Sequence, residues 1–117
     1  MNILLIEDEE PAANRIIKLL HQIDETFHLI EVIVSVKSAL EWLQKNPEPD
    51  LILSDIQIAD GKSLEIFETI KVKCPVIFIT AYDEYVMEAL ELKCVDYILK
   101  PVNKEVLADA IAKAQRI

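Results

Sequence analysis

Five polar residues follow short apolar runs of the sequence and are able to do chemistry together. Glu7 and Asp8 come directly after the first run, and Asp55, Thr80 and Lys100 follow or end later ones. Two carboxylates held about 4 Å apart repel by about 4 kcal/mol at an effective dielectric constant of about 20. Three carboxylates in one site therefore need compensating cations. Lys100 supplies one positive charge, and a metal ion would supply the rest.

The donors are all oxygen atoms, and no histidine or cysteine lies beside them in the sequence. Such a set favours a hard ion, and a site with few carboxylates and room for water favours Mg2+ over Ca2+. Glu7 and Asp8 would hold this ion together with a backbone carbonyl in the loop after Asp55. The chemistry that uses these parts is attack of a carboxylate on phosphorus, which gives an acyl phosphate. Asp55 is the expected nucleophile, and Mg2+, Lys100 and the Thr80 hydroxyl would neutralise the phosphoryl group.

The apolar runs that precede these residues have the character of buried strands. They are rich in Ile, Val and Leu and too short for helices, which is typical of strands covered on both faces. They are Asn2 to Ile6, Leu51 to Leu53, Val76 to Ile79 and Val95 to Leu99. A fifth run, over 29–34, is interrupted by Glu31 and predicts an edge strand.

Between the runs, apolar residues recur with the period of a helix. The pattern predicts five helices, over Ala13 to Leu20, Val36 to Leu43, Leu64 to Ile70, Val86 to Leu90 and Val106 to Ala114, the last with Asn103 as N-cap. Five alternating strands and helices define an α/β fold, a doubly wound five-stranded parallel sheet. The common strand order for such a sheet is 2-1-3-4-5, the flavodoxin-like arrangement. Strand three then lies between strands one and four, so Asp55 would lie between the acidic pair and Thr80.

Length and composition limit the classes of function. The 117 residues are enough for one domain, and 21 acidic against 12 basic side chains give a net charge of −9, which disfavours direct nucleic-acid binding. The single glycine excludes a glycine-rich phosphate loop. No apolar run approaches the length of a membrane span, and no export signal is visible, so we expect a cytoplasmic protein. Cys74 and Cys94 fit a reducing compartment and are interpreted as packing residues, with redox sensing as the less favoured alternative.

Four segments of the chain carry a family resemblance. In order, and across essentially the whole chain, LLIEDEE, LILSDIQIADG, VIFITA and VDYILKP resemble the signature regions of the receiver domain of bacterial two-component response regulators. The stretches DIQIADGKSLEIF and TAYDEYVMEAL are most similar to receivers joined to LytTR-type DNA-binding domains. The resemblance implies a receiver domain over residues 1–117, a regulatory phosphoacceptor rather than an enzyme. It also implies that an output domain, and any DNA contact, belongs beyond Ile117.

The resemblance assigns a role to each matching position of the acidic site. Asp55 would accept a phosphoryl group from a sensor histidine kinase. Asp8 would bind Mg2+ directly, Glu7 would support the ion largely through water, and Gln57 would give the metal its backbone carbonyl.

The same resemblance implies which residues contact the phosphoryl group and which respond to it. Thr80, the Ala81 amide and Lys100 would contact its oxygens. Tyr97 matches an aromatic residue that turns inward as Thr80 moves, and Lys100-Pro101 matches a peptide bond usually found cis. Phosphorylation would then alter the face made by the fourth helix, the fifth strand and the fifth helix, with a change of partner or homodimerisation and control of transcription as the output.

Three positions depart from the usual family pattern, and none removes a group that the chemistry needs. Glu7 replaces the commoner aspartate, Ala59 stands where many receivers have proline, and Cys94 stands where glycine is frequent. The longer Glu7 would change the water shell of the metal. Ala59 would leave the loop after Asp55 less rigid.

Three other functions compete with the receiver interpretation. A haloacid-dehalogenase-type phosphatase also forms an aspartyl phosphate, but it carries a second aspartate where this chain has Gln57. A flavin-binding module shares the fold but needs a Ser/Thr/Gly-rich phosphate loop. A pseudo-receiver that only binds partners is disfavoured because every reactive position is filled. Taken singly, each polar residue also has an ordinary structural explanation, such as Glu7 to Glu10 complementing a helix N-terminus.

Overall fold

The structure is a computed structural model that describes residues 1–117, and a five-stranded parallel sheet runs through its centre. The strand order is β2-β1-β3-β6-β7, which confirms the predicted order. The strands are β1 (Asn2–Ile6), β2 (His28–Ile33), β3 (Leu51–Ser54), β6 (Val76–Thr80) and β7 (Asp96–Leu99). The interrupted run is β2, and it lies at one edge of the sheet as expected.

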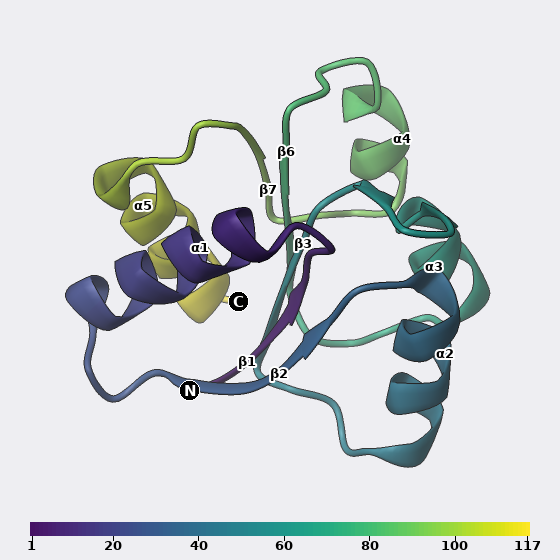
Figure 1. The fold of residues 1–117 in the computed structure, drawn as a ribbon, viewed down its shortest axis with the longest axis horizontal. Helices are drawn as coiled ribbons and strands as arrows, with labels where there is room; N and C mark the ends of the chain where they lie inside the picture. Colours follow the sequence, from purple (N-terminus) through teal and green to yellow (C-terminus); the bar gives the residue numbers. More distant parts are fainter.

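Helices cover both faces of the sheet (Figure 1). They are α1 (Glu10–Ile23), α2 (Val36–Lys45), α3 (Leu64–Thr69), α4 (Val86–Glu91) and α5 (Lys104–Gln115), and all five predicted helices are present. In Figure 1, α1 and α5 lie on one side of the sheet, and α2, α3 and α4 lie on the other. None of these helices combines the length and apolarity needed to cross a membrane.

The first strand shows why its sequence is a continuous apolar run. Side chains alternate along a strand, so successive residues point to opposite faces of the sheet. Ile3 and Leu5 pack in the core under α1 and α5, whereas Leu4 and Ile6 pack in the core under α2, α3 and α4. All four are essentially inaccessible to solvent. Because both faces are covered, neither set of positions is free to be polar.

The helix ends show one predicted cap and one corrected position. Asn103 accepts a hydrogen bond from the Val106 amide at 2.9 Å, so the predicted N-cap of α5 is confirmed. At the end of α4 the left-handed residue is Lys93, with φ of 61°, and not Cys94. The Cys94 amide reaches back to the Ala89 carbonyl, as in a helix C-terminal motif in which the left-handed position favours glycine. Glycine would therefore be favoured at the position of Lys93, one residue before Cys94, where the family pattern indicated glycine.

A short hairpin follows Asp55, where the sequence indicated only a loop. Its strands are β4 (Gln57–Ile58) and β5 (Gly61–Lys62), joined by a two-residue turn. Gly61 has φ of 153°, a conformation open to glycine and rarely adopted by other residues. The Asp60 carboxylate in the turn accepts hydrogen bonds from the first backbone amides of α2, at 2.6 and 3.1 Å. The hairpin is thus attached to a neighbouring helix.

Candidate functional site

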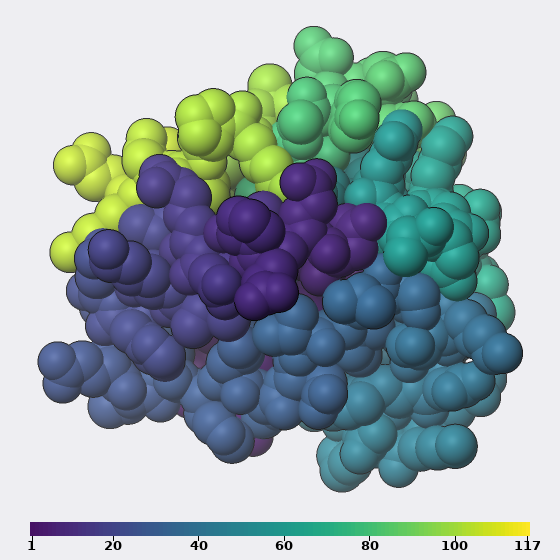
Figure 2. Space-filling model, in the orientation of Figure 1, coloured from purple at the N-terminus to yellow at the C-terminus, as the bar shows by residue number.

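Side chains from three strand ends meet at the carboxyl edge of the sheet. The Lys100 ammonium, which follows β7, lies 2.6 Å from Glu7 Oε1 and 2.7 Å from Asp55 Oδ2. Glu7 follows β1 and Asp55 follows β3, so residues distant in sequence form one ion-paired group, as predicted from the strand order. Figure 2 shows the purple segment that follows β1 on a face bordered by the teal, green and yellow-green segments. The loops after β1, β3, β6 and β7 therefore gather at one surface.

Burial sets the electrostatics of this group. The Glu7 side chain is 1% exposed, that of Asp55 8% and that of Lys100 21%. Burial raises the pKa of Glu7 above its ordinary value, against the opposing effect of Lys100. Burial alone would lower the pKa of Lys100, but the hydrogen bonds to Asp55 and Glu7 outweigh it and raise that pKa. Lys100 is therefore a firmly protonated cation that compensates two buried acids.

Asp55 is held in place on several sides. Its Oδ1 accepts a hydrogen bond from the Ile56 amide at 2.6 Å, and its own amide donates to the Ile6 carbonyl at 2.8 Å. Its carbonyl accepts hydrogen bonds from the hydroxyls of Ser54 and Ser63. These contacts fix the backbone and leave the carboxylate at the mouth of the site, 7% exposed as a residue. Such a preorganised carboxylate suits a nucleophile that must meet an incoming group in one orientation.

The proposed metal ligands are only partly assembled. Asp8 is exposed, and its carboxylate has no hydrogen-bond or ion-pair partner. No three acidic, histidine or cysteine side chains are gathered closely enough to form a metal cluster. Instead, Lys100 provides the cation between Glu7 and Asp55. The donors available at this edge are carboxylate and carbonyl oxygens, which is the chemistry that Mg2+ prefers.

The residues predicted to contact the phosphoryl group lie around the same edge of the sheet. Thr80 is fully buried at the end of β6, and its hydroxyl accepts a hydrogen bond from the Tyr82 amide at 3.3 Å, with no hydrogen bond to Asp55. The Lys100 amide donates to the Thr80 carbonyl at 2.8 Å, which joins the ends of β6 and β7. Ala81 is exposed. The Lys100-Pro101 bond is cis, as the family resemblance implied.

Tyr97 is attached to the loop that follows Thr80. Its phenol donates a hydrogen bond to the Tyr82 carbonyl, and its ring lies 6.5 Å from that of Phe78 between centroids. Burial raises the pKa of Tyr97 to about 12, so the phenol remains a donor at neutral pH. The residue predicted to act as a switch thus contacts the segment it would have to follow. Its movement stays a prediction.

Tyr85 was not identified from the sequence as a site residue. It is 7% exposed at the start of α4, and its hydroxyl accepts a hydrogen bond from Gln57 Nε2 at 2.9 Å. The Lys62 ammonium lies 4.8 Å from the centre of the same ring, a cation–π contact. The side chain of Gln57 therefore points to α4, while its backbone remains beside Asp55. No motif pointed to this contact, because it joins a two-residue strand to a short helix.

Comparison with known proteins identifies the class to which this fold and site belong. The family described as response regulator receiver domain matches residues 3–112, so the chain belongs to that family. The expected resemblance and the flavodoxin-like fold are both confirmed. A solved structure of the response regulatory domain of protein mrkE from Klebsiella pneumoniae superposes with a TM-score of 0.90 at 28% identity, over 99% of this chain and 96% of that one.

Curated relatives narrow the subgroup within this family. The chain is 35% identical to sensory transduction protein LytT of Bacillus anthracis, over 99% of this chain and 48% of that protein. It is 37% identical to transcriptional regulatory protein LytR of Staphylococcus aureus (strain N315), over 98% of this chain and 47% of that protein. The chain therefore spans about half the length of these relatives. It is a two-component receiver domain related to the LytT and LytR regulators, as the sequence segments indicated.

Proposed function

We propose that this domain is a phosphorylation-dependent switch in which Asp55 accepts a phosphoryl group from a sensor histidine kinase. One carboxylate oxygen of Asp55 forms a bond to phosphorus while the bond from phosphorus to the donor nitrogen breaks, and that nitrogen keeps the electron pair. The observation that carries the proposal is the geometry of Asp55. Glu7 and Asp55 both accept a backbone amide hydrogen bond and both pair with Lys100, but the amide contact of Asp55 is shorter, at 2.6 Å against 3.3 Å, and Asp55 is 7% exposed against 1% for Glu7.

Charge at the site must be compensated when the phosphoryl group arrives. An acyl phosphate adds up to about two negative charges to a place that already holds Glu7 and Asp55. Lys100 is positioned to contact a phosphoryl oxygen, and we assign the Thr80 hydroxyl and the Ala81 amide to the others. Thr80 needs only to exchange its acceptor role towards Tyr82 for a donor role towards phosphate, since a hydroxyl can do both.

Mg2+ is the cofactor that we propose for the reaction. Asp8, Asp55 and the backbone carbonyl of Gln57 would hold it directly, with Glu7 in support. When bound, this ion supplies positive charge that neutralises the transferring phosphoryl group. The exposure of Asp8 leaves its carboxylate free to serve as a ligand, and the oxygen-only donor set fits the ion.

We propose that the output is a change in the face made by α4, β7 and α5. Tyr97 in β7 donates to the Tyr82 carbonyl, two residues beyond Thr80, so movement of Thr80 towards a phosphate displaces the acceptor of the Tyr97 hydrogen bond. The face carries exposed apolar side chains at Met87, Leu90 and Leu99, which suit a second copy or a partner domain. Control of transcription would then be exerted through a further domain of the protein, in a cytoplasmic signalling pathway.

The test is Mg2+-dependent labelling by a small phosphodonor such as acetyl phosphate, followed by intact mass spectrometry. The native protein should gain one phosphoryl group, and omission of Mg2+ should suppress the gain. Asp55→Ala should abolish labelling, whereas the matched control Asp109→Ala, an exposed aspartate on α5, should label normally. Unchanged labelling of Asp55→Ala would refute the assignment. Repeated turnover of a small phosphoester would instead favour the phosphatase alternative.

A further inference from the structure

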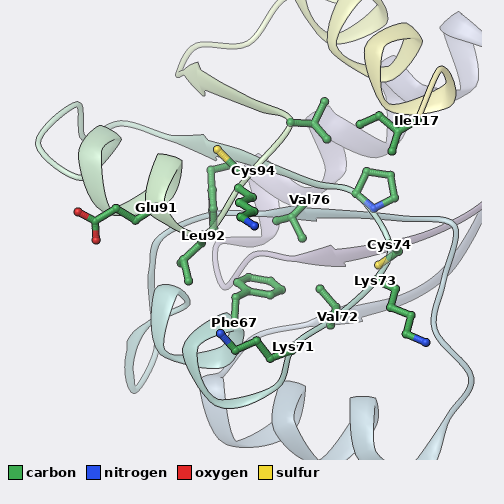
Figure 3. Close-up of a pocket in the computed structure, with 14 residues that line it drawn as sticks. Phe67, Lys71, Val72, Lys73, Cys74, Val76, Glu91, Leu92, Cys94 and Ile117 are labelled. Atoms are coloured by element: carbon green, nitrogen blue, oxygen red, sulfur yellow. The ribbon is translucent and has the colours of Figure 1, made fainter.

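A cavity of about 380 Å³ lies at the rim opposite Asp55, where β6 and β7 begin. It is bounded by the ends of α3 and α4 and by the segments that lead into the two strands, and nine of its 14 lining residues are hydrophobic (Figure 3). Its volume falls in the range of small-molecule sites, roughly 300–1,000 Å³. Because it lies at the amino ends of the strands, it is separate from the carboxyl-edge site.

Aromatic rings and neutral thiols form the walls of this cavity. Phe67 and Phe78 meet edge to face, with centroids 5.7 Å apart and planes at 78°. Cys74 and Cys94 also line it, and both are free thiols. Burial, with the nearby charge of Glu48, raises the pKa of Cys74 to about 12, and burial raises that of Cys94. The thiols therefore act as apolar wall groups at neutral pH and not as nucleophiles or metal ligands.

The charged residues that line the cavity are mostly basic, although the chain as a whole carries a net negative charge. Lys71, Lys73 and Lys93 line it, whereas Glu91 is its one acidic lining residue. In the chain as a whole, acidic residues outnumber basic ones by 21 to 12. Figure 3 shows the Glu91 carboxylate and the Lys73 ammonium both directed away from the other lining side chains. The Glu48 carboxylate nearby is occupied by backbone amides, at 2.9 to 3.1 Å.

Lys93 adopts a left-handed backbone conformation, which is unfavourable for a residue with a side chain. Lys93 has φ of 61° and is the chain's only non-glycine residue with positive φ. A left-handed conformation costs a residue with a side chain about 1–2 kcal/mol relative to the right-handed one. Glycine would fit there at no steric cost, yet the sequence places a cation at the edge of the cavity.

We propose that this cavity binds a small amphipathic anion, with its apolar body against the hydrophobic lining that includes Phe67 and its anionic group against the lysines. The hydrophobic lining supplies apolar contact, and the lysines at its edge supply the complementary charge. Neutral molecules of the same shape would lose the charge contribution, and cations would be repelled. The proposal does not depend on phosphorylation, because none of these residues belongs to the site around Asp55.

The test uses the fluorescent probe 8-anilinonaphthalene-1-sulfonate with the complete domain and no phosphodonor. Wild-type protein should bind one probe saturably, with amide shifts in two-dimensional NMR confined to the cavity segments. The triple variant K71Q/K73Q/K93Q should bind at least about 10-fold more weakly, a difference of about 1.4 kcal/mol. The matched control K18Q/K37Q/K45Q changes net charge equally at exposed sites elsewhere and should bind within about twofold of wild type.

Several results of these binding experiments would contradict the proposal. Absence of saturable binding, equal weakening in both triple variants, or amide shifts located elsewhere would overturn the proposal. The neutral probe N-phenyl-1-naphthylamine should bind more weakly than the sulfonate, and equal affinity would show that the lysines play no part. Urea unfolding of each variant, performed in parallel, separates loss of binding from loss of folding.

Discussion

Replacing Lys100 by methionine should reveal how much the Lys100 ammonium contributes to the free energy of unfolding. The substitution keeps an apolar stem of similar length but removes the charge that lies 2.6 Å from Glu7 and 2.7 Å from Asp55. Removing one partner of a buried ion pair typically costs about 3–5 kcal/mol, because the remaining charge is left uncompensated. Lys100 is 21% exposed, so we expect the lower part of that range, about 3 kcal/mol. A typical domain stability of about 5–15 kcal/mol would then fall to about 2–12 kcal/mol.

The loss should depend on pH in a defined direction. The pKa of Glu7 is already raised by burial, and Lys100 opposes that rise, so the variant should hold a proton on Glu7 more tightly still. A carboxyl whose pKa is raised in the folded state stabilises the fold at low pH, and that contribution is lost as pH rises through the raised value. The deficit of the variant should therefore be largest near pH 8 and smaller near pH 5. In the native protein, the contribution of Lys100 is present below its ordinary pKa of 10.5 and is lost only as pH rises through the raised value.

Urea unfolding followed by the fluorescence of Trp42, which is half-buried on α2, measures this quantity. With a slope of about 2 kcal/mol per molar, the midpoint should fall by about 1.5 M at pH 8. The control Lys113→Met breaks an exposed ion pair with Asp96 and should cost no more than about 1 kcal/mol at either pH. A loss below about 1 kcal/mol in Lys100→Met, or equal losses at pH 5 and pH 8, would refute the electrostatic reasoning.

Two further predictions concern residues away from the acidic site. Lys93→Gly should stabilise the protein by about 0.5 kcal/mol in urea unfolding, because relief of a left-handed strain of about 1–2 kcal/mol exceeds the added freedom of the unfolded chain. The control Lys18→Gly in the middle of α1 should instead lose about 1 kcal/mol, and a loss in both variants would contradict the strain argument. Iodoacetamide should alkylate Cys74 at pH 8 at least about a hundredfold more slowly in the native protein than in urea, because its pKa of about 12 keeps the thiolate scarce. The rate should rise with pH, and equal rates in the two states would show that the thiol is not shielded.

The sheet was predictable from sequence because its strands are buried on both faces. A continuous apolar run such as Asn2 to Ile6 shows no period, so its short length and its Ile and Leu content are what indicate a strand, and the acidic pair that follows marks the carboxyl edge. The β4–β5 hairpin was not predictable, because it contains only two residue pairs and depends on contacts distant in sequence. Asp60, for example, bonds to α2 more than 20 residues earlier in the chain.

The meeting of three of the predicted site residues was predictable, but the way in which they pair was not. The strand order brings Glu7, Asp55 and Lys100 to one edge, as expected. Sequence could not tell which residue of the acidic pair faces Lys100, since neighbours on an extended chain point to opposite sides. The structure turns Glu7 inward and Asp8 to solvent. Tyr85 was missed because its contact with Gln57 requires knowing how α4 lies over the hairpin.

The shared contacts of Tyr85 give the domain a weak brace between the hairpin after Asp55 and the start of α4. One hydrogen bond from Gln57 and one cation–π contact from Lys62 join the two elements. Together such contacts contribute about 1–2 kcal/mol, which corresponds to a separated form at roughly one molecule in six to one in thirty. The brace is therefore strong enough to keep the two elements in register most of the time. A change of about 1–2 kcal/mol in the relative stability of the two forms would therefore make them equally populated.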